Sequence, residues 1–527
     1  MNEVYDALNK EWKNACRMIF GQEAGELETY EKWLLEYNEA PLIRKSSATG
    51  KEIAYAVPYY RTGAKFSGFE EIDFQEKFAP LSINEIKDID SAIVAIKERV
   101  IYTGNIVLGN SDHVFGSSNV SDSYFIYKSG RVDASKYIAY SMDVRLAERA
   151  FGCVMLGRGN EYVIKILGSR LSKRCFESWH FNECADCYYV SGCDGCHDCI
   201  FSFNLNSRAF CIGNLVLTRE KYSKVKAQLI EQLASELENK KRLPSLMEII
   251  RKCKGKPPSL KTDETQGVNP PGQRKEIIDQ AFSKTCQVVL GRPLGTMDSL
   301  KHWLERNTYA IRTVPSAMSG IGALTSNYPP YLHAPLHRMV KLEEAYALEE
   351  TIKISEKEAL SITLHNAHEK IAPVAYMTIE KRVGIFENNI DDAINIDSVN
   401  CYRCSPSVEA KFCGYCFWPR NCEYVFGSQV LFQSTFCLKC YNSVKLIRCF
   451  EVDSSRDCSD CYFSHNIEGC QDCMFCFNVK SKRYAIGNVE LPKGEYLRIK
   501  KFILAEIAVK LEKNKDLPLD IYNLGAK

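Results

Sequence analysis

Residues 458–476 read CSDCYFSHNIEGCQDCMFC, and residues 184–199 read CADCYYVSGCDGCHDC. Both stretches repeat the spacing Cys-x-x-Cys, which nine pairs of cysteines share across the 527 residues. Of the 24 cysteines, all but four fall within two windows, residues 175–211 and 401–476. The first residues are polar and mixed in charge, unlike a secretory signal, so we expect a cytoplasmic chain. In that compartment disulfides are disfavoured, and Cys-x-x-Cys is typical of metal binding or redox chemistry.

The two windows belong to a tandem duplication of the whole chain. The segment from Cys184 to Asn214 realigns with Cys458 to Asn488 at a constant offset of 274, and the amphipathic helix that follows keeps this offset. Near the front of each half the offset is 270, where Cys16, Gly21, Gly25, Trp33 and Leu34 match Cys286, Gly291, Gly295, Trp303 and Leu304. Each half is therefore expected to run in one order: a helical block, a β-rich region and a closing helix.

The cysteines of the second window are spaced at alternating intervals of 12 and 9, which add to 21. Examples are the steps from Cys437 to Cys449 and from Cys449 to Cys458. All thirteen cysteines from 401 to 476 also share one phase of a three-residue count. A coil of about 21 residues with two sides explains these intervals as a β-solenoid, in which each residue stacks over its counterpart one coil away.

The predicted fold class is thus α+β, a tandem duplication in which each half is a helical block plus a cysteine-rich β-solenoid closed by an amphipathic helix. The first half divides into a helical block at 1–104 and a solenoid with its capping helix at 105–240. A basic linker follows at 241–274, where prolines and glycines break regular structure. The second half repeats the plan with a helical block at 275–378 and a solenoid with its capping helix at 379–527.

The cysteine spacing offers two geometries for a tetrahedral zinc ion, which prefers four thiolates. Along the chain, Cys-x2-Cys-x8-Cys-x2-Cys occurs three times, and across coils a fourth set has the spacing Cys-x2-Cys-x17-Cys-x2-Cys. The predicted ligands are Cys184, Cys187, Cys196, Cys199, Cys401, Cys404, Cys413, Cys416, Cys437, Cys440, Cys458, Cys461, Cys470 and Cys473. Free cysteine is also a small buried hydrophobe, so packed ladders of metal-free thiols remain the alternative. Iron–sulfur ligation is less favoured, because no recognised cluster spacing occurs.

Composition and motifs argue against several functions. The formal net charge of +2 gives no global basic field for nucleic acid, and no apolar run is long enough to cross a bilayer. None of the nine histidines lies in a recognised metal or catalytic motif, and no phosphate-binding loop or nucleophile elbow occurs. The sequence therefore assigns no catalytic residue and favours a protein that is not an enzyme.

Each cysteine window ends in a recognisable sequence motif. Residues 203–214 read FNLNSRAFCIGN, and residues 477–488 read FNVKSKRYAIGN. This wording resembles an uncharacterised cysteine-rich family of environmental bacterial and archaeal genomes, with Cys-x-x-Cys repeats followed by a Tyr-Cys-Ile-x-Asn ending and a helix. The resemblance covers the later part of each half, leaves the helical blocks outside it, and implies a solenoid architecture without an established activity. The chain departs from it where Cys211 of the first half faces Ala485 of the second.

These features predict a zinc-stabilised, non-enzymatic scaffold that presents rigid surfaces to a protein or ribonucleoprotein partner. The duplication makes the chain pseudo-dimeric, which suits protein–protein interaction with a two-fold or repeated partner and leaves further oligomerisation open. One alternative is association with nucleic acid or the ribosome through the linker and the closing helix, whose surface carries Arg498, Lys500 and Lys501. The other is a redox protein that uses its thiols or an iron–sulfur cluster.

Overall fold

The computed structural model describes residues 3–83, 86–157, 159–170, 172–258 and 274–526. The chain forms two compact units, each built from three separate segments. Unit 1 contains residues 1–41, 107–266 and 312–381, and unit 2 contains residues 42–106, 267–311 and 382–527. Each unit therefore takes one segment, 312–381 or 42–106, from the opposite half of the duplication.

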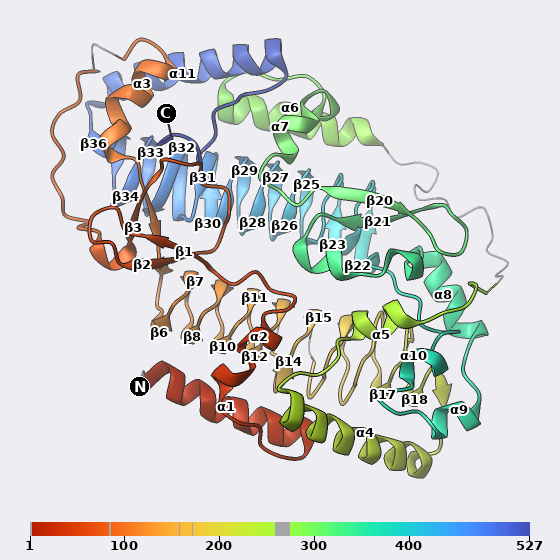
Figure 1. The fold of residues 1–527 in the computed structure, drawn as a ribbon. Coiled ribbons are helices and arrows are strands. Elements are labelled where there is room, and N and C mark those ends of the chain that lie inside the picture. The colour runs from red at the N-terminus through yellow and green to blue at the C-terminus, as the bar shows by residue number, and fades with distance from the viewer. Residues whose placement is uncertain (1–2, 84–85, 158, 171, 259–273, 527) are drawn as a thin grey trace. The chain divides into compact units, whose positions relative to one another are not determined.

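Unit 1 is built on a stack of short parallel strands, here called the first ladder (residues 107–217; Figure 1). One of its sheets has the order β16-β15-β13-β11-β9-β7-β5, a second has β14-β12-β10-β8-β6, and a third has β17-β18-β19. The strands are β5 (Val107–Leu108), β6 (Asp112–Phe115), β7 (Ser118–Ser121), β8 (Tyr124–Tyr127), β9 (Gly130–Asp133), β10 (Lys136–Ala139), β11 (Met142–Arg145), β12 (Glu148–Phe151), β13 (Val154–Gly157), β14 (Val163–Ile164), β15 (Leu167–Arg170), β16 (Trp179–Asn182), β17 (His197–Ile200), β18 (Ala209–Ile212) and β19 (Leu215–Val216).

The prediction of a cysteine-rich, two-sided β-solenoid with a coil length of 21 is wrong. Parallel strands pair positions that differ by 12 in most of the ladder, as Tyr124 with Lys136 and Cys461 with Cys473. What the structure contains is both helices and strands, with several parallel sheets and one large multi-strand sheet. Intervals of 9, 12 and 21 are all multiples of three, so each of them keeps the three-residue phase of the cysteines. Strands pair at a separation of 12, however, so residues that are 21 apart do not stack on each other.

The three-residue phase has a local cause in the backbone. Along both ladders nearly every third residue is left-handed, for example Asn400 (φ 57°) and Asp460 (φ 54°). Asn and Asp tolerate this conformation better than other non-glycine residues. Each left-handed residue turns the chain, and the residue after it, such as Cys401 or Cys461, faces the interior, where it is fully buried. Four such steps bring the chain back above its starting point, which gives the pairing of Cys461 with Cys473.

Helices cover the first ladder along its length. Helix α1 (Glu3–Phe20) packs on β6, β8, β10 and β12, and α4 (Arg219–Lys240) contacts α1 and β18. Between them, the 3-10 helix Leu27–Tyr30 and α2 (Glu31–Leu34) place Trp33 in the core. Helix α1 ends at Phe20, and the next residue, Gly21, has the left-handed conformation (φ 75°) that commonly terminates a helix.

Unit 2 has a second ladder (residues 382–490) that joins into one large sheet. Its path runs β27-β25-β23-β24-β26-β28-β30-β29-β31-β32-β33-β35-β36, with β22 paired to β23 and β34 to β32. The strands are β22 (Lys381–Glu387), β23 (Ile394–Val399), β24 (Ser407–Val408), β25 (Lys411–Gly414), β26 (Phe417–Arg420), β27 (Glu423–Phe426), β28 (Gln429–Phe432), β29 (Thr435–Leu438), β30 (Tyr441–Ile447), β31 (Phe450–Asp453), β32 (Arg456–Glu468), β33 (Gln471–Met474), β34 (Phe477–Lys480), β35 (Arg483–Ile486) and β36 (Val489–Glu490).

The helices of unit 2 repeat the arrangement of unit 1. Helix α6 (Lys275–Leu290) packs on β25, β27 and β29, and α11 (Lys493–Asn514) packs on α6 and β35. Between α6 and the ladder, the 3-10 helix Met297–Leu300 and α7 (Lys301–Glu305) place Trp303 in the core, as α2 places Trp33 in unit 1.

The exchanged segments, which belong to the blocks predicted as mostly helical at 1–104 and 275–378, contain strands as well as helices. The described part of residues 42–106 contains a two-stranded antiparallel sheet, a parallel pair of strands and an α-helix: β1 (Leu42–Lys45), β2 (Glu52–Tyr55), β3 (Lys65–Gly68), β4 (Ile101–Gly104) and α3 (Ile89–Ile96). The segment at 312–381 contains the pair β20 (Ile311–Pro315) and β21 (Gly322–Ser326), then α8 (Leu342–Thr351), α9 (Glu356–Leu360) and α10 (Ala367–Lys370). Short runs such as Glu52–Tyr55, with a buried face, are strand patterns that the helical interpretation overlooked.

Each exchanged segment is tied to the ladder of its own unit by buried polar contacts. In unit 1 the Tyr328 hydroxyl donates to Asp143 Oδ2 at 2.6 Å, and Asn204 Nδ2 donates to the carbonyl of Tyr376 at 2.9 Å. In unit 2 the backbone N–H of Thr103 donates to His465 Nε2 at 2.9 Å. Buried hydrogen bonds of this kind fix the register of the segment on the ladder.

The predicted linker at 241–274 is structured at its start. Helix α5 (Leu246–Lys252) begins with Ser245 as its N-cap and buries Leu246, Met247, Ile249 and Ile250. Residues 259–273 of the predicted linker lie outside the described residues. Within the described residues, no helix is long and apolar enough to span a bilayer.

Candidate functional site

The interior of each ladder is lined by small side chains, because one short turn of the chain encloses little space. In the second ladder the buried inward positions hold cysteine, serine, alanine, valine, leucine and isoleucine. Serine and cysteine make the same local bond there. The Ser141 hydroxyl donates to the carbonyl of Ala139 at 2.9 Å, and the thiol one turn later, Cys153, donates to the carbonyl of Phe151 at 3.4 Å. The cysteine thiol therefore makes the same bond, to the carbonyl two residues before it, as the serine hydroxyl one turn earlier.

All 24 cysteines of the chain lie among the described residues, and all are reduced and buried. Burial raises the pKa of the Cys153 and Cys413 thiols to about 12 each. The Cys413 Sγ lies 3.4 Å from the carbonyl oxygen of Lys411 and 3.8 Å from that of Cys422, and its one proton is shared between these two acceptors. The Cys153 and Cys413 thiols therefore stay neutral at physiological pH, whereas contact with neighbouring thiols lowers the pKa of Cys187 and Cys196. Zinc and nucleophilic chemistry both require the thiolate.

Three of the four predicted cysteine sets are brought together as neighbours on two successive turns. Positions that differ by 12 stack, and positions that differ by 3 lie on adjacent sides, so the four thiols of one set are close enough to influence one another's pKa. These sets are Cys184, Cys187, Cys196 and Cys199; Cys401, Cys404, Cys413 and Cys416; and Cys458, Cys461, Cys470 and Cys473. The cross-coil set is not assembled, because Cys449 lies between Cys437 and Cys461 in the same column.

Among the described residues, no group of three or more Cys, His, Asp or Glu side chains is placed to hold one metal ion. The neighbouring thiols instead continue above and below each set, so that Cys187 contacts Cys175 as well as Cys199. A column of this kind satisfies its thiols with carbonyls and with each other. The zinc sites stay a prediction, and the geometry fits the packed-ladder alternative better.

A buried charge cluster, which the cysteine pattern did not point to, lies beside the first ladder. The Lys165 ammonium is fully buried, 2.7 Å from Glu36 and 3.4 Å from Glu177, and it stands 4.6 Å from the centre of the Tyr37 ring. The Glu177 carboxylate is also fully buried, and it accepts the N–H of Leu246, the first residue of α5, at 3.1 Å. Burial raises the pKa of Glu177 to about 7.

Unit 2 has the matching cluster at an offset of 274. The buried Lys439 ammonium lies 4.0 Å from Glu451, and it donates to the carbonyls of Trp303 at 2.8 Å and Arg306 at 2.9 Å. Glu451 accepts the N–H of Ile521 at 2.9 Å, and burial raises the pKa of this carboxyl to about 8. Both glutamates therefore hold the segment that follows a closing helix against the ladder.

An ion pair next to each cluster has exchanged its charges between the halves. In unit 1 Glu36 pairs with Arg242, whereas at the matched positions in unit 2 Arg306 pairs with Asp516. Reversal of both charges keeps the attraction between these two positions, whereas the lysine–glutamate pair itself has the same charges in both halves.

A buried histidine–aspartate pair in unit 2 has the composition of a catalytic dyad, but neither nitrogen of its histidine ring is available to a substrate. His465 Nδ1 lies 2.8 Å from Asp453, and its Nε2 accepts the Thr103 N–H, so the ring is held with both nitrogens engaged. The Tyr522 hydroxyl also donates to Asp453 at 3.0 Å. A general base needs a nitrogen that can reach a substrate, and this ring has none to offer.

Sequence reasoning missed the lysine–glutamate clusters because it followed cysteine alone. A signal was present: Lys165 and Glu177 are 12 apart, as are Lys439 and Glu451, and both pairs obey the 274 offset. Comparison with known proteins adds no assignment, since no family model, no curated protein and no solved structure matches the chain.

Proposed function

We propose that this protein is a non-enzymatic binding scaffold for a protein partner, with metal-free thiol ladders as its structural core. The supporting observation is that the buried thiols and the buried glutamate carboxylates bind groups within the protein. The thiols donate to carbonyls of the ladder, and the buried carboxylates of Glu177 and Glu451 hold backbone N–H groups. What remains for function is the outer surface of two rigid, helix-covered ladders.

Native purification with mass spectrometry tests this proposal. We expect a protein partner that stays bound through gel filtration and through nuclease treatment, with fewer than about 0.5 zinc ions per chain, against the one ion or more that a single structural site holds. Loss of the partner on nuclease treatment, with a steep dependence of binding on salt, would instead support the ribonucleoprotein alternative. Thiol-dependent turnover, or a visible absorption band from an iron–sulfur cluster, would overturn the proposal.

A further inference from the structure

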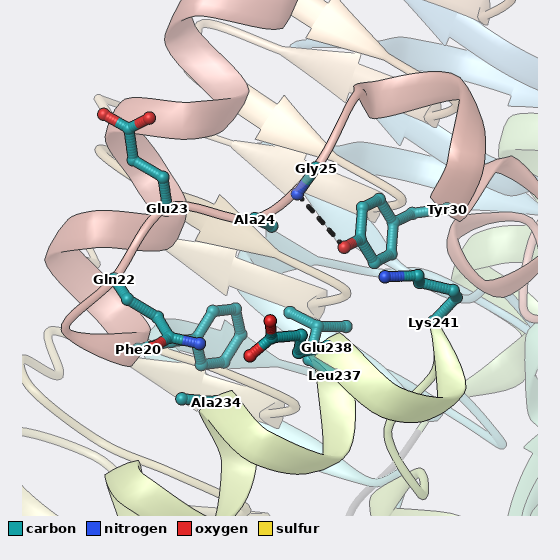
Figure 2. A pocket seen from close by; sticks show the side chains of 10 residues that line it. All are labelled: Phe20, Gln22, Glu23, Ala24, Gly25, Tyr30, Ala234, Leu237, Glu238 and Lys241. Carbon is teal, nitrogen blue, oxygen red and sulfur yellow. Dashed lines mark hydrogen bonds between the residues drawn. The ribbon is translucent and has the colours of Figure 1, made fainter.

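Unit 1 has a surface pocket that lies where α1 and α4 end together (Figure 2). Its volume is about 320 Å³, at the small end of the range of ligand sites. The rings of Phe20 and Tyr30 form its apolar walls, and Gln22, Glu238 and Lys241 supply polar groups. Figure 2 shows the Glu238 carboxylate between the Phe20 ring and the side formed by Tyr30 and Lys241.

The electrostatics of the pocket favour a cation next to Glu238. Helix α1 ends at Phe20 and α4 at Lys240, so two helix C-termini, each the negative end of a dipole, converge here. Within the described residues, the Glu238 carboxylate makes no hydrogen bond or ion pair. The second carboxylate at the rim, Glu23, is already paired with Arg17.

The duplicated half shows which cation fits this position. The counterpart of Glu238 is Glu512, and the counterpart of Gln22 is Arg292, from the offsets of 274 and 270. In unit 2 the Arg292 guanidinium lies 2.9 Å from the Glu512 carboxylate, so the equivalent place is filled from within the chain. Leu294, which is buried, stands there in place of the smaller Ala24 of unit 1.

We propose that the unit 1 pocket binds a guanidinium group from outside the chain, in the place that Arg292 fills in unit 2. The guanidinium pairs with Glu238 through its planar fork of N–H donors. The Phe20 and Tyr30 rings are only 2% and 1% exposed, so they back the pocket without offering a free face for stacking. Ala24 in place of leucine leaves the space, and Gln22 in place of arginine leaves the carboxylate open. A chain without a macromolecular partner has the same pocket, so this site stands apart from the scaffold proposal.

The guanidinium has two sources, free arginine or an arginine side chain within a partner, and Lys241 separates them. The Lys241 ammonium lines the same pocket and attracts the carboxylate of a free or C-terminal arginine. An internal arginine has no such carboxylate, and Lys241 then repels its guanidinium. Binding of L-arginine and of N-acetyl-L-arginine amide, compared in wild type and in Lys241→Ala, assigns the source.

Saturation-transfer NMR and calorimetry with these two probes on the full chain test the site, with L-citrulline as the uncharged analogue. We expect binding of one or both arginine probes, no binding of citrulline, and weakening of about tenfold or more in Glu238→Gln, which keeps the shape and removes the charge. Gln22→Arg, which copies unit 2, is expected to abolish binding while Glu238 remains. The matched control Glu512→Gln removes the same charge in unit 2 and is expected to leave binding unchanged.

Two results would overturn this site. Equal binding of citrulline and arginine would show that charge pairing with Glu238 plays no part. Undiminished arginine binding in both Glu238→Gln and Gln22→Arg would place the ligand elsewhere on the chain. Unchanged melting temperatures of the variants confirm that they are folded.

Discussion

Replacement of Lys165 by methionine is the sharpest test of the buried clusters. Lys165 is fully buried, and in the described part of the chain its ammonium is the only cation within 4 Å of the Glu177 carboxylate. Methionine keeps the apolar stem and removes the charge. Breaking a buried pair on one side typically costs about 3–5 kcal/mol of unfolding free energy, because the partner is left uncompensated.

The effect of this substitution on the free energy of unfolding should increase with pH, whereas a simple loss of packing would not depend on pH. The pKa of Glu177 is about 7 in the folded protein and about 4.5 in the unfolded chain, a raised value, so the folded state binds the proton more tightly. Its contribution to stability is full below pH 4.5 and is lost as the pH rises to about 7, a difference of about 3 kcal/mol at 1.36 kcal/mol per pH unit. Without Lys165 the pKa of Glu177 rises further, and the loss continues above pH 7.

We therefore expect Lys165→Met to destabilise unit 1 by about 1–2 kcal/mol at pH 5.5, where Glu177 is neutral, and by about 3–5 kcal/mol at pH 8. Urea unfolding together with hydrogen exchange of the first ladder measures both values. The double variant Lys165→Met/Glu177→Gln is expected to regain most of the loss at pH 8. Lys173→Met is the surface control, since that ammonium is 60% exposed and lies 4.0 Å from Glu161; its effect should stay within about 0.5 kcal/mol. A pH-independent loss below about 1 kcal/mol for Lys165→Met would refute the reasoning.

Three further predictions concern the ladders. Because all 24 thiols are buried, iodoacetamide at pH 8 should alkylate fewer than about one in ten of them in the folded chain and all of them in urea; rapid native labelling would contradict a packed ladder. Gly152→Ala should lower the melting temperature far more than Gly159→Ala. Both glycines are left-handed (φ 67° and 63°), but only at Gly152 would a Cβ meet another group, the carbonyl of Leu34 at 2.7 Å. Complete chelation of metal ions at neutral pH should leave hydrogen exchange in residues 175–211 and 401–476 unchanged. Faster exchange there would support the predicted zinc sites.

Some features of the fold could be predicted from local sequence. The phase of three along the cysteine windows reflects a backbone that turns at every third residue, so Cys461 and Cys473 face inward on successive turns. The offsets of 270 and 274 place Trp33 with Trp303 and Lys165 with Lys439. These are properties of short segments and of their repetition, which a single chain displays directly.

Other features depend on pairing between distant segments. The length of a turn is set by which strands hydrogen-bond, and intervals of 9, 12 and 21 all keep the inward phase while only 12 matches the strand register. Residues 42–106 belong to unit 2 and residues 312–381 to unit 1, an assignment that rests on contacts between segments far apart in the sequence. From sequence order alone, each segment would be expected to pack on the ladder of its own half. Only the tertiary structure shows that it packs on the ladder of the other half.

The same division holds for the sites. The sequence by itself determined the duplication, the inward phase of the cysteines and the absence of a recognised catalytic motif. Only the tertiary structure decided that the thiols stack as ladders, that Lys165 meets Glu36 and Glu177, and that Glu238 faces a pocket where Glu512 faces an arginine. The physical reason is that spacing fixes the direction of a side chain, whereas its partner and its ionisation depend on what the fold brings within a few ångströms.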